Sequence, residues 1–289
     1  MPALIALLAV TAVWGITFVQ VKDAVAIYPL FAFLALRFAI ASVALGVPGV
    51  RRVRGLGVVG SSAGALLGAL LAAGYALQTA GLARTTVSNA GFVTGMYVVL
   101  TPVIALAVFR LRIGAAAWVG VAVATGGLAL LSGLDVGSLS GDLLVLAGAA
   151  VYALQIVLME RFAPRYDPLA FTLVEMVSAC LLLGVVAAAR GDFSVPHGWT
   201  VWGALLVTGV FASALAFLAQ TWAQRRASAT RTALVFAMEP VFAALFGYTL
   251  AGDRLGWAGW GGCAVIMAGI LIAEPAAAGS LARLVRRAA

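Results

Sequence analysis

The sequence contains few charged residues, and this scarcity is the first limit on what the protein can be. Only 10% of its 289 residues are Asp, Glu, Lys or Arg, whereas 64% are hydrophobic. A soluble globular chain of ordinary composition carries about 25% charged residues. Together with a mean hydropathy of +1.12, this composition excludes a soluble globular protein and indicates a chain that lies largely in lipid.

Residues that bind metals or act as nucleophiles are equally scarce. The chain has two cysteines, Cys180 and Cys263, a single histidine, His197, and a single lysine, Lys22. Both cysteines fall inside apolar runs, so a disulfide framework is not expected. An intramembrane enzyme would need a metal cluster, a catalytic dyad or a cofactor lysine. We therefore expect a protein that is not an enzyme and that carries no metal and no cofactor.

Long apolar runs fill almost the whole chain. A helix of about 20 residues crosses a bilayer core of roughly 30 Å, so these runs predict an all-α polytopic membrane protein. The connections between them are short and leave almost no chain for a soluble domain. Ten transmembrane helices are expected, at about residues 3–21, 30–47, 57–80, 87–109, 114–132, 142–160, 168–189, 199–222, 232–250 and 256–273.

Basic residues divide unevenly between the two sides of the predicted membrane protein. If the N-terminus is cytoplasmic, the opposite side holds only Lys22, Arg84, Arg190 and Arg254. Such a bias is the positive-inside signature, and it predicts a bacterial inner-membrane protein with both termini in the cytoplasm. It also accounts for the net charge of +8, so no nucleic-acid partner is expected. The inner side holds Arg51, Arg52, Arg54, Arg110, Arg112, Arg161, Arg165, Arg225, Arg226, Arg231, Arg283, Arg286 and Arg287.

The sequence repeats itself once, weakly, along its length. Pro102 and Pro240 lie 138 positions apart in similar apolar surroundings. This self-similarity predicts two copies of one unit, residues 1–134 and 135–275, followed by a short basic tail at 276–289. Three further pairs share nearly the same offset: Trp14 with Tyr152, Arg37 with Glu175, and Gln78 with Gln220.

The number of helices in each copy determines how the two copies are oriented in the membrane. Because five is odd, the second copy must enter the membrane from the opposite side, and the repeats are inverted around a central cavity. Two inverted halves can exchange non-identical conformations, which is alternating access. A proline within a helix removes a backbone hydrogen bond and bends the helix, so Pro102 and Pro240 are predicted hinge or gating residues.

Polar residues within the spans are the candidates for substrate binding, because amides and hydroxyls form hydrogen bonds while aromatic faces contact apolar or cationic groups. Among the ionisable residues, Arg37 and Glu175 are expected to be structural. Glu239, directly before a proline, is a candidate for binding a substrate amine or a proton, and the alternative is a structural hydrogen-bonding role. The predicted substrate-binding residues are Trp14, Gln20, Tyr75, Gln78, Asn89, Tyr97, Tyr152, Gln155, Gln220, Trp222 and Glu239.

Glycines recur at every fourth position in the third span, at Gly60, Gly64 and Gly68, and the fourth span carries Gly91 and Gly95. Small residues at this spacing let two helix backbones approach closely in lipid. The pattern predicts that the third and fourth spans pack against each other through these glycines.

Several of these segments together resemble the EamA family of the drug/metabolite transporter superfamily, a family of ten-span bacterial exporters. The similarity covers essentially the whole chain, and the paired proline segments are its most specific part. The segments that carry it are Ala12-Val13-Trp14-Gly15, Leu36-Arg37-Phe38, Thr86-Val87-Ser88-Asn89-Ala90-Gly91-Phe92, Thr101-Pro102, Ser228-Ala229-Thr230-Arg231-Thr232-Ala233, Glu239-Pro240-Val241-Phe242-Ala243-Ala244-Leu245 and Asp253-Arg254-Leu255.

The resemblance implies a secondary transporter that exports small amphipathic metabolites, namely amino acids including aromatic ones. Its partners would be that small-molecule substrate and membrane lipid, and the two-repeat chain could be complete as a monomer. Two alternatives stay open. One is a carrier of drugs or other metabolites from the same superfamily, although the first span lacks the carboxylate that cationic-drug antiporters use. The other is a channel-like facilitator.

Overall fold

The computed structural model describes residues 2–85, 87–110, 113–132, 138–246 and 256–273, apart from the side chains of residues 88, 89, 131, 132 and 243. Every regular element in these residues is a helix. Most are α-helical, η1 and η2 are 3-10 helices, and η3 is a π-helix. In chain order they are α1 (Pro2–Ile27), α2 (Leu30–Gly49), η1 (Val50–Leu56), α3 (Gly57–Leu82), α4 (Val87–Gly95), α5 (Tyr97–Phe109), α6 (Ala115–Ser132), α7 (Leu139–Phe162), η2 (Ala163–Arg165), α8 (Pro168–Arg190), α9 (Gly198–Leu206), η3 (Val207–Leu215), α10 (Ala216–Gln224), α11 (Ala229–Phe236), α12 (Glu239–Phe246) and α13 (Trp257–Ala273).

The helices are long and apolar enough for a membrane protein. Among the described residues, seven helical segments of at least 18 residues have the hydropathy needed to cross a bilayer, and two more apolar helices are shorter. One of the seven, Leu30–Leu82, contains both α2 and α3, because η1 joins them without a gap. The predicted all-α polytopic membrane protein is confirmed, while the count of ten spans and the inversion of the second half remain predictions.

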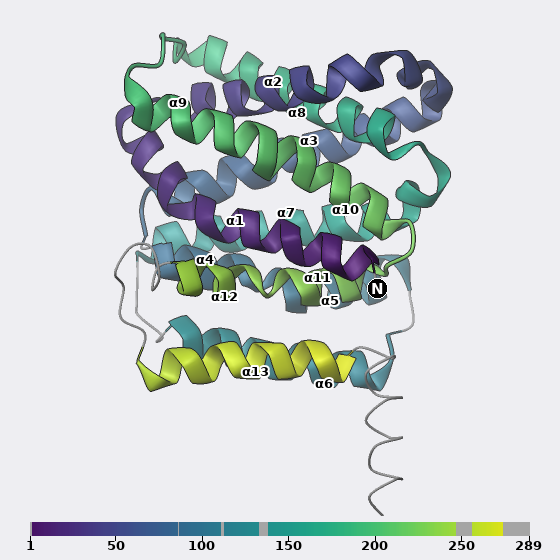
Figure 1. Ribbon diagram of the computed structural model, residues 1–289, viewed down its shortest axis with the longest axis vertical. Helices are drawn as coiled ribbons and strands as arrows, with labels where there is room; N and C mark the ends of the chain where they lie inside the picture. The colour runs from purple at the N-terminus through teal and green to yellow at the C-terminus, as the bar shows by residue number, and fades with distance from the viewer. Residues whose placement is uncertain (1, 86, 111–112, 133–137, 247–255, 274–289) are drawn as a thin grey trace, which may run out of the picture.

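The helices lie side by side, with their axes running roughly in one direction across the view in Figure 1. Helices α6 and α13 pack on each other along one end of the molecule, and α2 packs on α8 at the other end. Helix α3 contacts both α7 and α8. Helices from the two halves of the sequence are therefore intermingled, and the core lies between them.

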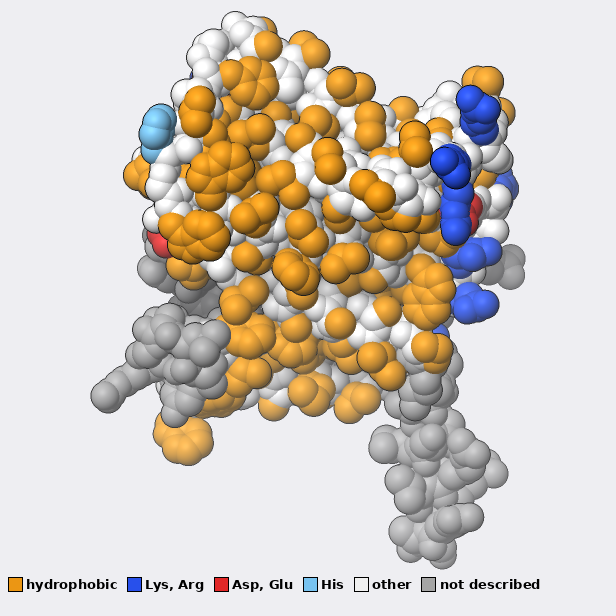
Figure 2. All heavy atoms as spheres, turned by 45° about the horizontal axis from the view of Figure 1, so that its top comes forward, with side chains coloured by type: hydrophobic (Ala, Val, Ile, Leu, Met, Phe, Trp, Pro, Cys, Tyr) orange, Lys and Arg blue, Asp and Glu red, His pale blue; other side chains and the backbone are white. Residues whose placement is uncertain are grey.

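The exterior of this bundle is apolar, as lipid contact requires. Side chains such as Val47, Val58 and Val185 are exposed, and hydrophobic groups cover most of the face in Figure 2. Basic side chains gather instead along one edge of that face, the right-hand edge, where Figure 1 also places the N-terminus.

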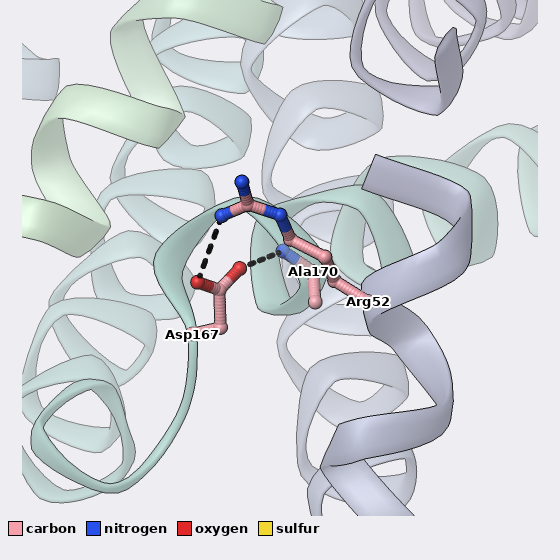
Figure 3. A network of polar contacts seen from close by, with 3 residues as sticks. All are labelled: Arg52, Asp167 and Ala170. Carbon is pink, nitrogen blue, oxygen red and sulfur yellow. Dashed lines mark hydrogen bonds and ion pairs between the residues drawn. The ribbon is translucent and has the colours of Figure 1, made fainter. Parts of the chain in front are cut away.

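Asp167 fixes the start of a helix and also pairs with an arginine. Asp167 precedes α8, and its Oδ1 accepts a hydrogen bond of 3.0 Å from the backbone N–H of Ala170. Its Oδ2 lies 3.4 Å from Nη1 of Arg52 in η1 (Figure 3). The cap satisfies an amide that the helix itself cannot, while the ion pair, being exposed, contributes little to stability. Together they join the α2–α3 connection to the start of α8.

The glycine stripe of α3 faces α8 rather than the fourth span, so the predicted packing was wrong. An added Cβ at Gly68 would collide with the carbonyl oxygen of Glu175 and lie 2.7 Å from Cβ of Ser178. At Gly64 it would lie 3.0 Å from Val174, also on α8. Gly95 instead adjoins Leu128 of α6. Spacing alone identifies a close approach, but it does not identify the partner helix.

Three segments interrupt regular α-helix inside the bundle. Helix α4 gives way to α5 at Met96, and α11 gives way to α12 at residues 237 and 238. The π-helical η3 separates α9 from α10. The two predicted hinge prolines differ in position, because Pro102 lies inside α5 while Pro240 is the second residue of α12. In both places the interruption lies on the N-terminal side of the proline.

Replacing Gly68 with alanine tests the close contact between α3 and α8. Even a methyl group has no room there, so the helices must separate, and we expect a loss of about 1–3 kcal/mol. For a protein of this size that corresponds to a melting temperature lower by roughly 2–10 °C, measured by thermal unfolding in detergent. Gly184→Ala on α8 is the matched control, because nothing lies within 4 Å of its Cβ position. Equal melting temperatures for the two variants would contradict this packing.

Candidate functional site

A cavity lies between helices from both halves of the sequence. It offers about 60 Å³ in which a water-sized sphere can be centred, which is room for a few water molecules at roughly 10–15 Å³ each. Helices α1, α2, α3, α4 and α5 line it together with α7, α10, α11 and α12. The lining residues are Trp14, Thr17, Phe18, Val21, Arg37, Tyr75, Gln78, Thr79, Leu82, Thr94, Tyr97, Tyr152, Gln155, Ile156, Phe217, Gln220, Phe236 and Glu239.

Most of the predicted binding residues meet at this cavity, namely Trp14, Tyr75, Gln78, Tyr97, Tyr152, Gln155, Gln220 and Glu239. Two others do not. Trp222 lines a separate, open groove beside Arg52 and Asp167, because it lies two residues from Gln220 and so on the opposite side of α10. Gln20 is not in the lining, and its Oε1 is buried without a hydrogen-bond partner. The Asn89 side chain lies outside the described residues.

Aromatic rings form one continuous wall. Trp14 of α1 lies between Phe217 and Phe236, with ring centroids 5.5 and 4.9 Å away. Tyr75 and Tyr152 meet edge to face at 5.4 Å. The glycine at position 74 makes room for the Tyr152 ring, since an added Cβ would lie 2.6 Å from it. Such a wall offers apolar and π contacts to a ligand.

Arg37 of α2 is buried against η3. Its Nε donates to Ser213 Oγ at 2.7 Å, and its Nη2 lies 3.1 Å from the Tyr75 hydroxyl and 3.4 Å from the Ala212 carbonyl oxygen. The Trp14 indole N–H donates to the same carbonyl at 2.8 Å. Gly209 permits this approach, because an added Cβ there would lie 3.1 Å from the Arg37 carbonyl oxygen. The π-helical segment thus supplies the acceptors that hold Arg37 and Trp14.

Glu175, the repeat equivalent of Arg37, lies behind the cavity wall and is not part of the lining. Its Oε1 accepts a hydrogen bond of 2.9 Å from Gln155, while Oε2 is buried without a partner. Gln220 donates to Gln155 Oε1 at 3.1 Å and to Gln224 Oε1 at 2.9 Å. These amides form a chain from a buried carboxyl group to the cavity surface.

A second polar chain crosses from α7 to α4. The Tyr152 hydroxyl donates to Gln78 Oε1 at 3.1 Å, and Gln78 Nε2 donates to Thr94 Oγ1 at 3.0 Å. The Gln78 amide oxygen and nitrogen each have one partner and could each form a further hydrogen bond, and Gln78 lines the cavity. These two bonds hold the amide in position and leave it able to form further hydrogen bonds.

Glu239 is joined to the helix interruption beside it through Tyr97. The Tyr97 hydroxyl lies 2.9 Å from the Phe236 carbonyl oxygen and 3.2 Å from Glu239 Oε2. In an α-helix that carbonyl would accept from the N–H four residues later, but residue 240 is proline and has none. Tyr97, from the first half of the chain, supplies the missing donor. The hydroxyl thereby couples the carboxyl group to the α11–α12 junction.

The lining also reflects the internal repeat. Trp14 and Tyr152 lie 138 positions apart, as predicted, and both face the cavity. The pairs Thr17 with Gln155 and Phe18 with Ile156 share that offset, and Tyr75 with Phe217 and Gln78 with Gln220 share an offset of 142. Equivalent positions of the two halves therefore contribute to one site.

Several lining residues were absent from the predicted set, and some of them could have been found. Phe18 and Val21 follow Trp14 at i+4 and i+7, the spacing of a single helix face. Phe217 and Phe236 carry no such signal, since phenylalanine is common throughout apolar spans. Arg37 was expected to be structural, whereas it also borders the cavity.

Comparison with known proteins decides what kind of protein contains this cavity. The sequence model of the EamA-like transporter family matches residues 1–133 and, separately, residues 139–273. The chain belongs to the EamA-like transporter family. It is therefore a multi-pass membrane transporter of the drug/metabolite superfamily, as the resemblance of its motifs predicted.

Individual relatives agree with this family. An uncharacterized transporter of Archaeoglobus fulgidus is 30% identical over 263 residues, which are 91% of this chain and 82% of that protein. The uncharacterized transporter YyaM of Bacillus subtilis is 27% identical over 188 residues, 61% of this chain and 60% of its own length. A protein of known crystal structure matches with a TM-score of 0.78 over 95% of this chain and 97% of the other, at 20% identity. That last likeness concerns the fold alone.

Removing the Tyr97 hydroxyl tests its role at the helix junction. Tyr97→Phe leaves the Phe236 carbonyl without its donor, and an unsatisfied buried acceptor costs about 1–3 kcal/mol. We expect a lower melting temperature and faster amide hydrogen exchange in residues 237–242. Tyr166→Phe is the control, because the Tyr166 ring stacks on Phe171 and no described side chain or backbone group bonds its hydroxyl. Unchanged exchange in the Tyr97 variant would show that the junction does not depend on this bond.

Proposed function

We propose that this transporter is a secondary carrier that exports small amphipathic metabolites, namely amino acids including aromatic ones, by alternating access. The observation that carries the proposal is the cavity, in which aromatic rings, amides, a carboxyl group and a guanidinium meet between the two halves of the chain. Its lining is amphipathic, and this matches a solute with an apolar side chain and polar ends.

The architecture in this proposal is ten spans in two inverted repeats. Supporting it, the family model matches the chain twice, and α2 packs on α8 and α6 on α13, pairs that the repeat makes equivalent. The paired positions in the cavity lining are a second support, because a two-fold axis through the cavity would bring such positions together.

Alternating access requires the small cavity to open toward each side in turn. The interruptions at Met96, at residues 237–238 and along η3 lie next to the lining, so helix segments could tilt there while their outer ends stay packed. Pro102 and Pro240 keep their proposed role as hinge residues, since neither can close the backbone hydrogen bond four residues back.

Glu239 has two proposed roles, binding of the substrate amine and binding of a proton. A carboxylate attracts an ammonium group strongly where water is excluded. The Tyr97 hydroxyl has one proton to donate, so it cannot fully serve both the Phe236 carbonyl and an ionised Glu239. A protonated Glu239 could donate to Tyr97 and leave the other bond intact. Protonation would in this way act on the α11–α12 junction.

Transport by purified protein tests the proposed function directly. Proteoliposomes are loaded with a panel of labelled amino acids, and flux is followed with and without a pH gradient. We expect saturable flux that favours aromatic and other apolar amino acids and that is inhibited by unlabelled substrate. Flux that rises linearly with concentration would indicate a channel instead, and flux of cationic drugs alone would indicate the other branch of the superfamily.

The variant Glu239→Gln tests the carboxyl group within that assay. The amide can donate to Tyr97 like a protonated carboxyl group but cannot carry a negative charge, so amino-acid flux should fall by about tenfold or more and lose its dependence on pH. The control is Asp192→Asn, which removes a partly buried carboxylate that pairs with Arg190 and does not line the cavity. A Glu239→Gln protein with normal flux and normal pH dependence would eliminate Glu239 from the mechanism.

Labelling of single cysteines tests the orientation, with both termini in the cytoplasm of a bacterial inner membrane. In a background with Cys180→Ser and Cys263→Ser, a membrane-impermeant maleimide applied to spheroplasts should modify His197→Cys and not Arg226→Cys. Permeabilised cells should label both, which controls for reactivity. The reverse pattern would overturn the orientation derived from the basic residues.

A further inference from the structure

The guanidinium of Arg37 has hydrogen-bonding capacity that the protein does not use. Arginine carries five N–H groups. The bonds to Ser213, Tyr75 and Ala212 engage Nε and Nη2. Among the described residues no acceptor forms a hydrogen bond with Nη1. This atom is also not fully buried. Arg37 lines the cavity, so a ligand there can reach its side chain.

Among the described residues no carboxylate lies within ion-pair distance of Arg37, although Glu239 lines the same cavity and interacts with it electrostatically over a longer distance. In the described part of the chain the ion pairs are Arg52 with Asp167 and Arg190 with Asp192. Glu175, the repeat equivalent of Arg37, bonds to Gln155 instead. Arg37 as a whole residue is only 3% exposed, so its guanidinium has given up most of its hydration, which is unfavourable unless another group replaces the water. Such a site favours an anionic ligand.

The orientation of the guanidinium suits a carboxylate. Its Cζ lies 4.4 Å from the centroid of the Tyr75 ring and 5.8 Å from that of Phe38. Stacking on Tyr75 and the bond to Ser213 hold the planar group in one position, so that a ligand would not have to order it. A fixed guanidinium edge recognises a carboxylate more specifically than a flexible lysine would.

We infer, building on the proposed export of amino acids through this cavity, that Arg37 binds the substrate carboxylate. Glu239 lines the same cavity from α12 and is the proposed partner of the amine. The aromatic wall between the two halves contacts the side chain. The substrate class is therefore α-amino acids with a free carboxylate, and their amides and decarboxylated amines are poor substrates.

Substrate selectivity separates this role from a structural one, because Arg37 also ties α2 to η3. Proteoliposomes containing the full chain are assayed with labelled phenylalanine and with labelled phenylalaninamide. Wild-type protein should prefer phenylalanine by about tenfold or more. In Arg37→Gln, phenylalanine flux should fall by a similar factor while amide flux changes less than about twofold. An unchanged ratio of the two fluxes, with both reduced, would overturn the inference and assign Arg37 to structure alone.

Two further variants accompany this experiment. Arg190→Gln removes an exposed guanidinium that lies 5.3 Å from the Phe31 ring, and its flux ratio should equal that of the wild type. Arg37→Lys keeps the charge without the planar edge, so it should give an intermediate ratio and serves if Arg37→Gln does not fold. A wild-type ratio in Arg37→Lys and in Arg37→Gln alike would contradict carboxylate recognition.

A binding measurement tests the carboxylate site independently of transport. 3-Phenylpropionate has the carboxylate and ring but no amine, and 3-phenylpropionamide lacks the charge. The acid should raise the melting temperature of the wild type, the amide should not, and Arg37→Gln should abolish the shift. If this pattern holds while no amino acid is transported, the export proposal fails and the carboxylate site stands. If the acid does not stabilise the wild type, the carboxylate site is overturned.

Discussion

A backbone amide or carbonyl without a partner costs several kcal/mol in hydrocarbon, and most of this structure follows from that constraint. Continuous helices satisfy it over most of the chain. Where the helices are interrupted, at Met96, at residues 237–238 and along η3, the interruptions lie inside the bundle beside the cavity. There, side chains of the protein supply partners: Tyr97 donates to the Phe236 carbonyl, and Trp14 and Arg37 reach the carbonyl of Ala212.

Close packing of helix backbones places the side chains of the cavity. Gly74 leaves room for the Tyr152 ring, and Gly209 lets the π-helical segment approach α2 near Arg37. The stripe at Gly64 and Gly68 brings α3 onto α8. None of these glycines belongs to the lining, yet each sets the separation of helices that do carry lining residues or their partners. The geometry of the site is therefore a property of the whole bundle.

The two halves of the chain contribute equivalent positions but different chemistry. Gln78 and Gln220 are identical, whereas Tyr75 corresponds to Phe217 and Arg37 corresponds to Glu175. Only the first member of the charged pair borders the cavity. A repeated framework can in this way enclose a site with unlike ends, which a solute with an amine and a carboxylate requires. The differences between the two halves make the two ends of the cavity chemically unlike. The shared framework of the halves places the cavity between them.

The sequence by itself determined the fold class, the family and most of the polar residues that line the cavity. Each span must have the length and hydropathy that lipid requires, so a polar residue within a span stands out in the sequence. Helix periodicity could also have shown that Trp222 lies on the opposite side of α10 from Gln220, away from the cavity. Tertiary structure alone decided which helices face each other, since the α3 glycines could have matched any smooth helix surface. It also decided that Arg37 meets η3 rather than a carboxylate, and that Tyr97 serves a carbonyl 139 positions away, because such contacts depend on how separate helices pack and leave no periodic trace in the sequence.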